Sequence, residues 1–133
     1  MDGKEEKIED LKTMVPNQPD TGLKVESHEG VVVVRFTEEV VLSGRKANLV
    51  SDHLTSLVED PGHQRMVLDC ANVRSITSNM LGALITVYRT AEAAGGRFVL
   101  CNLPPVIYDI MKVTKLNTVI SIYDDERAAL DSF

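Results

Sequence analysis

Residues 65–103, RMVLDCANVRSITSNMLGALITVYRTAEAAGGRFVLCNL, combine two strand patterns with one helix pattern. The apolar runs RMVLDC (65–70) and RFVLCNL (97–103) predict buried strands, because a continuous apolar run suits a strand covered on both faces. Gly95-Gly96 marks the end of the helix between them. Strand, helix and strand in this order predict two parallel strands joined by a right-handed crossover. The apolar core positions of the helix recur at helical spacing: Leu81, Leu84, Ile85 and Tyr88.

The rest of the chain extends this alternation in both directions. A hairpin with a turn at Glu29-Gly30 comes first, and its second strand, VVVVRF (31–36), is apolar enough to be central. The predicted order is ββαβαβαβα, which is an α/β fold with a mixed β-sheet and helices packed on it. The remaining elements are a helix between Ser43-Gly44 and Pro61-Gly62, a short helix from Pro104 through Lys112, a strand at 119–123 and a terminal helix at 124–130.

Residues 1–22 differ in composition from the rest of the chain. They contain the breaker-rich run VPNQPDTG, with Pro16 and Pro19, just ahead of the first predicted strand. We therefore expect an N-terminal tail at 1–22 and one folded domain at 23–133. The apolar residues of the tail have the spacing of a short helical stripe: Ile8, Leu11 and Met14.

The composition disfavours several classes of protein. The 133 residues carry a formal net charge of −6 and 5% aromatic residues, whereas a protein that follows nucleic-acid phosphates needs a basic face. No apolar stretch approaches the ~18–20 residues that a bilayer span requires. The first residues, MDGKEEKIEDLKTM, are charged where a signal peptide would be apolar. We therefore expect a cytoplasmic protein that binds neither nucleic acid nor membrane.

Cysteine and histidine spacing indicates no metal or cofactor site. Cys70 and Cys101 each lie at the end of an apolar run, and we expect them to be reduced core residues. The histidines lack metal-ligand spacing, and the sequence contains no phosphate-binding loop, dinucleotide fingerprint or nucleophilic-serine motif. We therefore expect no metal, no cofactor and no enzymatic activity. The histidines, expected at surface or turn positions, are His28, His53 and His63.

Short motifs across residues 23–131 resemble the STAS domain of bacterial anti-sigma factor antagonists. Val67-Leu68-Asp69 matches a strand of that family ending in Leu-Asp, and Leu81-Gly82 matches the start of the next helix. Gly95-Gly96 and Leu100-Cys101-Asn102 match the Gly-rich turn and the following strand. The resemblance implies a STAS-like fold and a non-catalytic regulatory module. Its implied partner is an anti-sigma factor or a related serine kinase.

The chain departs from the family pattern in the segment that carries the family's switch. There, a serine of Asp-Ser-Ser-Gly, usually the second, is phosphorylated by a partner kinase, and this releases the antagonist. Here Thr77-Ser78-Asn79-Met80 occupies the four positions, and Asn79 cannot form a phosphate ester. The resemblance implies Ser78 and Thr77 as candidate phosphoacceptors. It implies that partner binding uses Thr77, Ser78, Asn79 and Met80, within the segment 75–82.

Each of these residues also has a structural interpretation. Ser78 is a candidate N-cap of the helix, and Met80 is either a partner contact or an inward-facing residue that fills a gap. A phosphate at the helix start would meet unpaired N–H groups and the positive end of the helix dipole. Asp69 is a lone carboxylate at a strand end, where we expect it to cap a turn.

Two further function classes compete with the regulatory module. The main alternative is a STAS module that binds a small molecule or nucleotide without a phosphoswitch, although no motif identifies a ligand. The other is a receiver-like domain phosphorylated on Asp69. It is disfavoured because such domains resemble a strand–helix alternation without an initial hairpin. They also need a lysine after the last strand, where Tyr123-Asp124-Asp125 stands. The sequence does not predict the oligomeric state.

Overall fold

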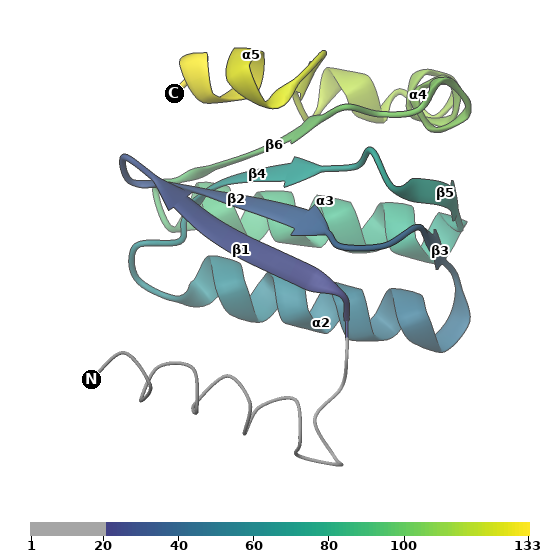
Figure 1. The fold of residues 1–133 in the computed structure, drawn as a ribbon, viewed down its shortest axis with the longest axis horizontal. Coiled ribbons are helices and arrows are strands. Elements are labelled where there is room, and N and C mark those ends of the chain that lie inside the picture. Colours follow the sequence, from purple (N-terminus) through teal and green to yellow (C-terminus); the bar gives the residue numbers. More distant parts are fainter. Residues whose placement is uncertain (1–20) are drawn as a thin grey trace.

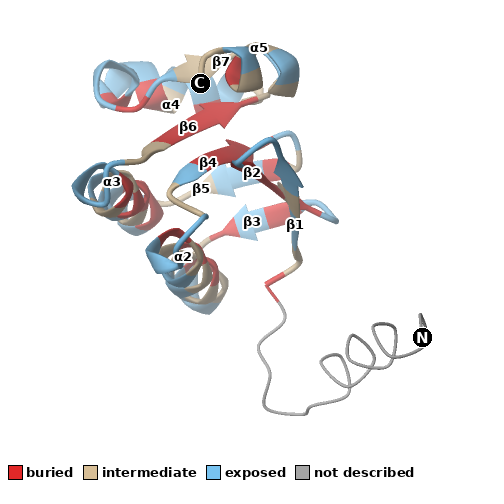
Figure 2. Cartoon of the chain, turned by 90° about the vertical axis from the view of Figure 1, so that its left-hand side faces the viewer, coloured by how far each residue is buried: buried red, intermediate tan, exposed pale blue. Residues whose placement is uncertain are grey.

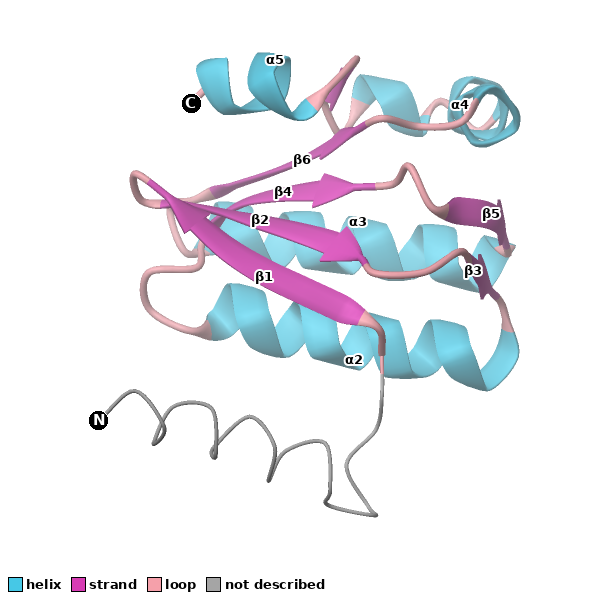
Figure 3. Ribbon diagram, in the orientation of Figure 1, coloured by secondary structure: helices cyan, strands magenta, loops and turns pink. Residues whose placement is uncertain are grey.

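A mixed five-stranded sheet lies at the centre of the structure, a computed structural model that describes residues 21–133 (Figures 1 and 3). Nearly all of the predicted tail, with its apolar stripe at 8–14, therefore lies outside the described residues. In spatial order the strands are β1 (Leu23–His28), β2 (Val31–Phe36), β4 (Arg65–Asp69), β6 (Arg97–Cys101) and β7 (Ile122–Tyr123). β1 and β2 form the predicted antiparallel hairpin, and the other neighbours are parallel.

Helices cover the two faces of this sheet unequally. The long helices α2 (Gly44–Glu59) and α3 (Ser78–Ala93) pack against each other on one face, where Figure 2 views them end-on. The six-residue helix α5 (Glu126–Asp131) lies on the other face. α4 (Pro105–Val113) and the 3₁₀ helix η1 (Leu116–Thr118) connect β6 to β7. Within residues 21–133, no helix is both long and apolar enough to cross a bilayer.

The alternation of β2 explains why the sheet has a core on each face. Val32 and Val34 point into the larger core beneath α2 and α3. Val31 and Val33 belong to the smaller cluster, which Ala129 of α5 covers. All four valines are buried, which confirms the prediction of a central strand.

A second, two-stranded sheet departs from the predicted element order. It pairs β3 (Val40–Leu42) with β5 (Val73–Ile76) in parallel, and neither strand was predicted. With three and four residues, they are too short for a recognisable periodicity, and β5 has exposed residues at Arg74 and Ser75. The order ββαβαβαβα is therefore correct for the main sheet but incomplete for the domain.

The last predicted strand is shorter than expected. Only Ile122–Tyr123 pairs with β6, whereas the prediction covered 119–123. Leu116 and Ile120 are both buried in the larger core, and the N–H of Ile120 donates to the carbonyl of Leu116 at 2.9 Å. The chain therefore keeps a helical turn as far as Ile120, because this turn places the side chains of Leu116 and Ile120 on the core face.

Both cysteines are free and buried, as predicted. Cys70 lies in the larger core and Cys101 in the smaller one, so the sheet separates their side chains. Burial is the main reason that the pKa of each thiol lies well above its ordinary value. Each cysteine therefore acts as a small apolar residue of its own core.

Candidate functional site

The N-terminus of α3 is held against the small sheet by Thr77. The N–H of Thr77 donates to the carbonyl of Leu42 at 3.1 Å, at the end of β3. The Thr77 hydroxyl oxygen also accepts from the N–H of Met80 at 3.4 Å, and Thr77 has the extended backbone of an N-cap. The interpretation of Ser78 as the N-cap is therefore wrong by one position, because β3 fixes Thr77 as the last extended residue.

Ser78 and Asn79 are exposed in the first turn of α3. Their backbone N–H groups are among the four that an α-helix leaves without an intrahelical acceptor. The first turn of α3 contains no acidic side chain. The site therefore presents a serine hydroxyl and an asparagine amide to solvent, in a setting that accepts negative charge.

Met80 faces inward and is 1% exposed. It lies in the larger core with Leu81 and Leu84, which were predicted to be core residues, and Ile85 packs against the same core. Of the two interpretations of Met80, the structure has the inward-facing one. Met80 therefore packs in the core beneath the first turn of α3 and is not part of the exposed surface of the candidate site.

The surface beside Ser78 is formed by β3, β5 and α4. Figure 1 shows these elements at the same end of the molecule as the N-termini of α2 and α3. Val41 is 51% exposed on β3, and Val106 is 58% exposed near the start of α4. An exposed ion pair joins Arg74 to Glu39 at 3.5 Å. These groups line the end of the molecule at which Ser78 and Asn79 are exposed, although single exposed apolar residues are common on protein surfaces.

Asp69 lies at the end of β4 and is almost completely buried. Its Oδ1 accepts from the N–H of Ala71 at 2.9 Å, and its Oδ2 accepts from Nδ2 of Asn102 at 3.0 Å. It therefore caps the turn after β4, as predicted. Burial and the neighbouring Glu126 carboxylate raise the pKa of Asp69 above its ordinary value.

These contacts argue against a receiver-like role for Asp69. An acyl-phosphate acceptor needs an accessible carboxylate, whereas Asp69 is buried and hydrogen-bonded through both oxygens. Among residues 21–133 there is also no cluster of three or more histidine, cysteine, aspartate or glutamate side chains able to hold a metal ion.

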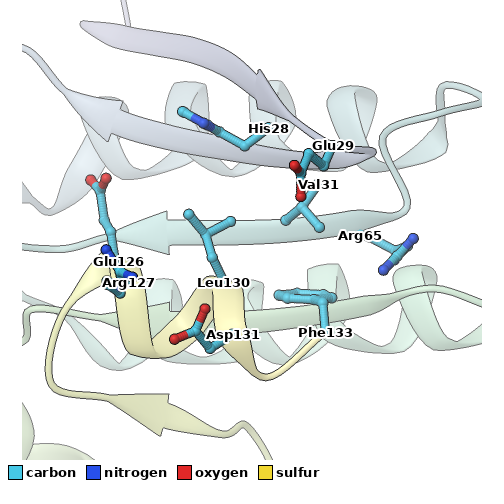
Figure 4. Close-up of a pocket in the computed structure, with 9 residues that line it drawn as sticks. All are labelled: His28, Glu29, Val31, Arg65, Glu126, Arg127, Leu130, Asp131 and Phe133. Carbon is cyan, nitrogen blue, oxygen red and sulfur yellow. The ribbon is translucent and has the colours of Figure 1, made fainter.

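A cavity of about 690 Å³ lies between the β1–β2 hairpin and α5 (Figure 4). Its apolar lining is Val31, Leu130 and Phe133, and Arg65 stacks over the Phe133 ring at 5.6 Å. Sequence reasoning missed this cavity, since it joins residues from opposite ends of the chain. The charged and polar rim consists of His28, Glu29, Glu126, Arg127 and Asp131.

Comparison with known proteins assigns the family. A family model described as the STAS domain matches residues 23–129. The chain belongs to the STAS domain family. A curated relative of this STAS domain is the anti-sigma F factor antagonist of Paenibacillus polymyxa. It is 25% identical over 108 residues, which cover 81% of this chain and 91% of the relative.

Solved structures confirm the predicted fold class of this STAS domain. An anti-sigma factor antagonist from Mycobacterium paratuberculosis superimposes with a TM-score of 0.72 at 23% identity, covering 83% of this chain and 91% of the other. The anti-sigma factor antagonist SpoIIAA, in its unphosphorylated form, gives a TM-score of 0.68 at 17% identity, with coverages of 83% and 94%. SpoIIAA of Bacillus is also known in a phosphorylated form, with a TM-score of 0.62. Regulation and signalling follow from membership of this family.

Proposed function

We propose that this STAS domain acts as an anti-sigma factor antagonist that binds an anti-sigma factor, or a related serine kinase, through the surface at the start of α3. Its family and its relatives support a regulatory module. Within that surface, Ser78 and Asn79 are the exposed residues of the predicted set. We further propose that phosphorylation of Ser78 releases the partner.

The observation that carries this proposal is that the hydroxyl groups of Thr77 and Ser78 have different environments. The Thr77 hydroxyl caps α3 and also contacts the carbonyl of Leu42 at 3.4 Å. The Ser78 hydroxyl is exposed and makes no hydrogen bond within residues 21–133. Modification of Thr77 would cost the helix its cap, whereas modification of Ser78 would leave the cap intact. Ser78 is therefore the better acceptor of the two.

A phosphate on Ser78 would leave this fold stable but would weaken the binding of a partner. It adds a charge of about −1.5 to −2 at neutral pH, next to unpaired N–H groups and the positive end of the α3 dipole. Residues 71–91 contain no aspartate or glutamate that would repel it. A partner surface that packs on Asn79 and Val41 would lose contact, because the phosphate must remain solvated.

Affinity capture from a native lysate, with mass spectrometry, tests both parts of this proposal. Trypsin cleaves after Arg74 and Arg89 and releases the peptide 75–89, in which fragmentation distinguishes phosphate on Ser78 from phosphate on Thr77. We expect an anti-sigma factor or serine kinase to be captured by the wild-type chain and lost with Ser78→Asp. Ser56→Asp, at an exposed position of α2, is the matched control and retains the partner.

Three outcomes separate the parts of the proposal. A partner that Ser78→Asp and Asn79→Lys both leave bound would refute the α3 surface. A kinase that binds without phosphorylating residues 75–89 would refute the switch and leave a constitutive antagonist. Phosphate on Thr77 alone would reverse the assignment between the two hydroxyls.

The cavity beside α5 is the one observation that favours the small-molecule alternative. Its guanidinium groups, Arg65 and Arg127, are able to bind phosphate oxygens of a nucleotide. The carboxylates on the same rim oppose an anionic ligand: Glu29, Glu126 and Asp131. Under this alternative, GTP or ATP raises the midpoint of thermal unfolding, inorganic phosphate does not, and Arg127→Ala removes the shift. No shift with either nucleotide would refute it.

A further inference from the structure

The outer edge of β1 has no partner strand within residues 21–133. β1 is the first strand of the main sheet, and its only neighbour there is β2. Figure 2 shows β1 at the margin of the described part of the molecule. An edge strand of six residues presents N–H and C=O groups that are able to pair with another chain.

The hydrogen bonds of the hairpin identify which groups of β1 point outward. The N–H of Thr37 donates to the carbonyl of Gly22 at 2.8 Å, and the hairpin register places these residues opposite each other. Hydrogen-bonded positions alternate along an antiparallel pair. Every second position counted from Gly22 therefore bonds to β2. The backbone groups that point to the free edge belong to Leu23, Val25 and Ser27.

We propose that β1 is a dimerisation edge, where a second copy of this chain pairs antiparallel with it about a twofold axis at Val25. In this register Leu23 lies opposite Ser27 of the second copy, and Val25 lies opposite its own equivalent. All three outward positions of β1 are then paired with one another, and the two sheets become continuous.

Charge complementarity favours this register over registers shifted by one residue. The intervening positions place Lys24 opposite Glu26 of the second copy, and the symmetry repeats the pair. They are non-hydrogen-bonded positions, where the Cα atoms approach to about 4.5 Å and side chains interact best. A shift of the axis by one residue would place Lys24 opposite Lys24 or Glu26 opposite Glu26, which is repulsive. A lysine on an edge usually deters pairing, but here the matching position carries Glu26. Its carboxylate also accepts from Arg35 of the same chain, so Lys24 of the second copy would join an existing ion pair.

The burial pattern of β1 is consistent with this dimer. Val25 is 38% exposed, although it follows the apolar alternation of the strand. Pairing at the twofold axis would bring two copies of this side chain together and remove apolar surface from water. The paired stretch spans only Leu23 to Ser27, far less than a standard interface, so we expect a weak dimer whose population rises with concentration.

Sedimentation equilibrium of the full chain, from micromolar to millimolar protein, tests the proposal. We expect the apparent mass to rise from 14.7 kDa towards twice that value. Val25→Pro should abolish the rise, because it removes the central outward N–H group and no bond of the hairpin. Amide hydrogen exchange should slow with concentration at Leu23, Val25 and Ser27.

Charge reversal tests the register even if the proline variant does not fold. Lys24→Glu and Glu26→Lys each place like charges opposite one another and should weaken the dimer about tenfold. An equimolar mixture of the two variants should restore dimerisation, since each carboxylate of one variant would then face an ammonium group of the other. Glu26→Lys also removes the ion pair between Glu26 and Arg35 within the chain, whereas the two hydrogen bonds from Arg35 to Glu126 do not involve residue 24 or 26. Circular dichroism checks that each variant is folded.

The proposal is overturned by a wild-type chain that remains monomeric at millimolar concentration. It is equally overturned by a dimer that survives Val25→Pro in a folded chain. Charge variants that each dimerise as well as wild type, or a mixture that fails to recover, would exclude the register. These outcomes do not involve Ser78 or any partner, so they are independent of the proposed function.

Discussion

Arg35 on β2 binds Glu126 in the first turn of α5 through two parallel hydrogen bonds. Its Nε donates to Oε2 at 2.6 Å and its Nη2 donates to Oε1 at 2.7 Å. The same guanidinium also donates to Glu26 on β1. A bidentate pair of this kind fixes orientation as well as distance. It therefore attaches α5 to the sheet above the smaller core, between residues far apart in sequence.

Loss of this attachment should destabilise the domain. Arg35→Met leaves two carboxylates without their cation and should lower the free energy of unfolding by about 1–3 kcal/mol, as urea denaturation would measure. Amide exchange should accelerate first in α5. The matched control is Arg74→Met, which breaks an exposed ion pair with Glu39 and should change stability by less than about 0.5 kcal/mol. Equal effects of both substitutions would contradict this account.

Acid should weaken the same contact. Hydrogen bonding to Arg35 lowers the pKa of Glu126 from 4.5 to about 2. Because the folded-state pKa is the lower one, this stabilisation is present above pH 4.5 and is lost as the pH falls towards 2. Urea midpoints measured across this range should fall more steeply for wild type than for Glu126→Gln. Urea midpoints that fall equally with pH in wild type and Glu126→Gln would show that Glu126 is not the source of this pH dependence.

Asp69 should have the opposite pH dependence. Its pKa is raised from 3.8, mainly by burial and then by Glu126. A raised pKa contributes stability below pH 3.8 that is lost as the pH rises through the folded-state value. Asp69→Asn removes this ionisation. The stability of Asp69→Asn relative to wild type should therefore improve as the pH rises above 3.8. A stability difference that stays constant or declines with rising pH would exclude this role of Asp69.

The cap of α3 depends on Thr77 rather than on its neighbour. Thr77→Val keeps the shape of the side chain but removes the acceptor for the N–H of Met80. It should cost about 1 kcal/mol of stability in thermal or urea unfolding. Ser78→Ala should stay within about 0.5 kcal/mol of wild type, because its side chain is exposed. The reverse ranking would restore Ser78 as the cap.

Two glycines should respond oppositely to the same substitution. A Cβ at Gly96 would lie 2.1 Å from the carbonyl oxygen of Gln64, so Gly96→Ala forces the backbone apart and should cost about 1–3 kcal/mol. Gly82 lies within α3 with nothing within 4 Å of the added Cβ. Gly82→Ala should stabilise by about 0.5–1 kcal/mol. Urea denaturation of both variants and wild type measures the two changes in the free energy of unfolding.

Local patterns were sufficient for most of the main sheet and its helices. α3 was predicted because its apolar residues recur at helical spacing, and β2 because a continuous apolar run follows a hairpin turn. The parallel crossover between β4 and β6 followed from the order of elements, since handedness leaves few topologies. Core positions such as Leu84 followed from the same spacing.

The details of the candidate site depended on contacts between distant segments. Thr77 became the cap because β3 supplies the carbonyl of Leu42, 35 residues earlier in the chain. The direction of Met80 was open in the sequence, because both faces of a first helical turn suit methionine, and core packing decided it.

Periodicity and composition thus determined the α/β class and the central strands, and the resemblance to the STAS family located the segment 77–80. Tertiary contacts alone decided the β3–β5 pair, the Arg35–Glu126 attachment and the cavity beside α5. The physical reason is the separation of the interacting residues along the sequence. A hydrophobic period lies within a few consecutive residues, whereas these three features join groups that only the folded chain brings together.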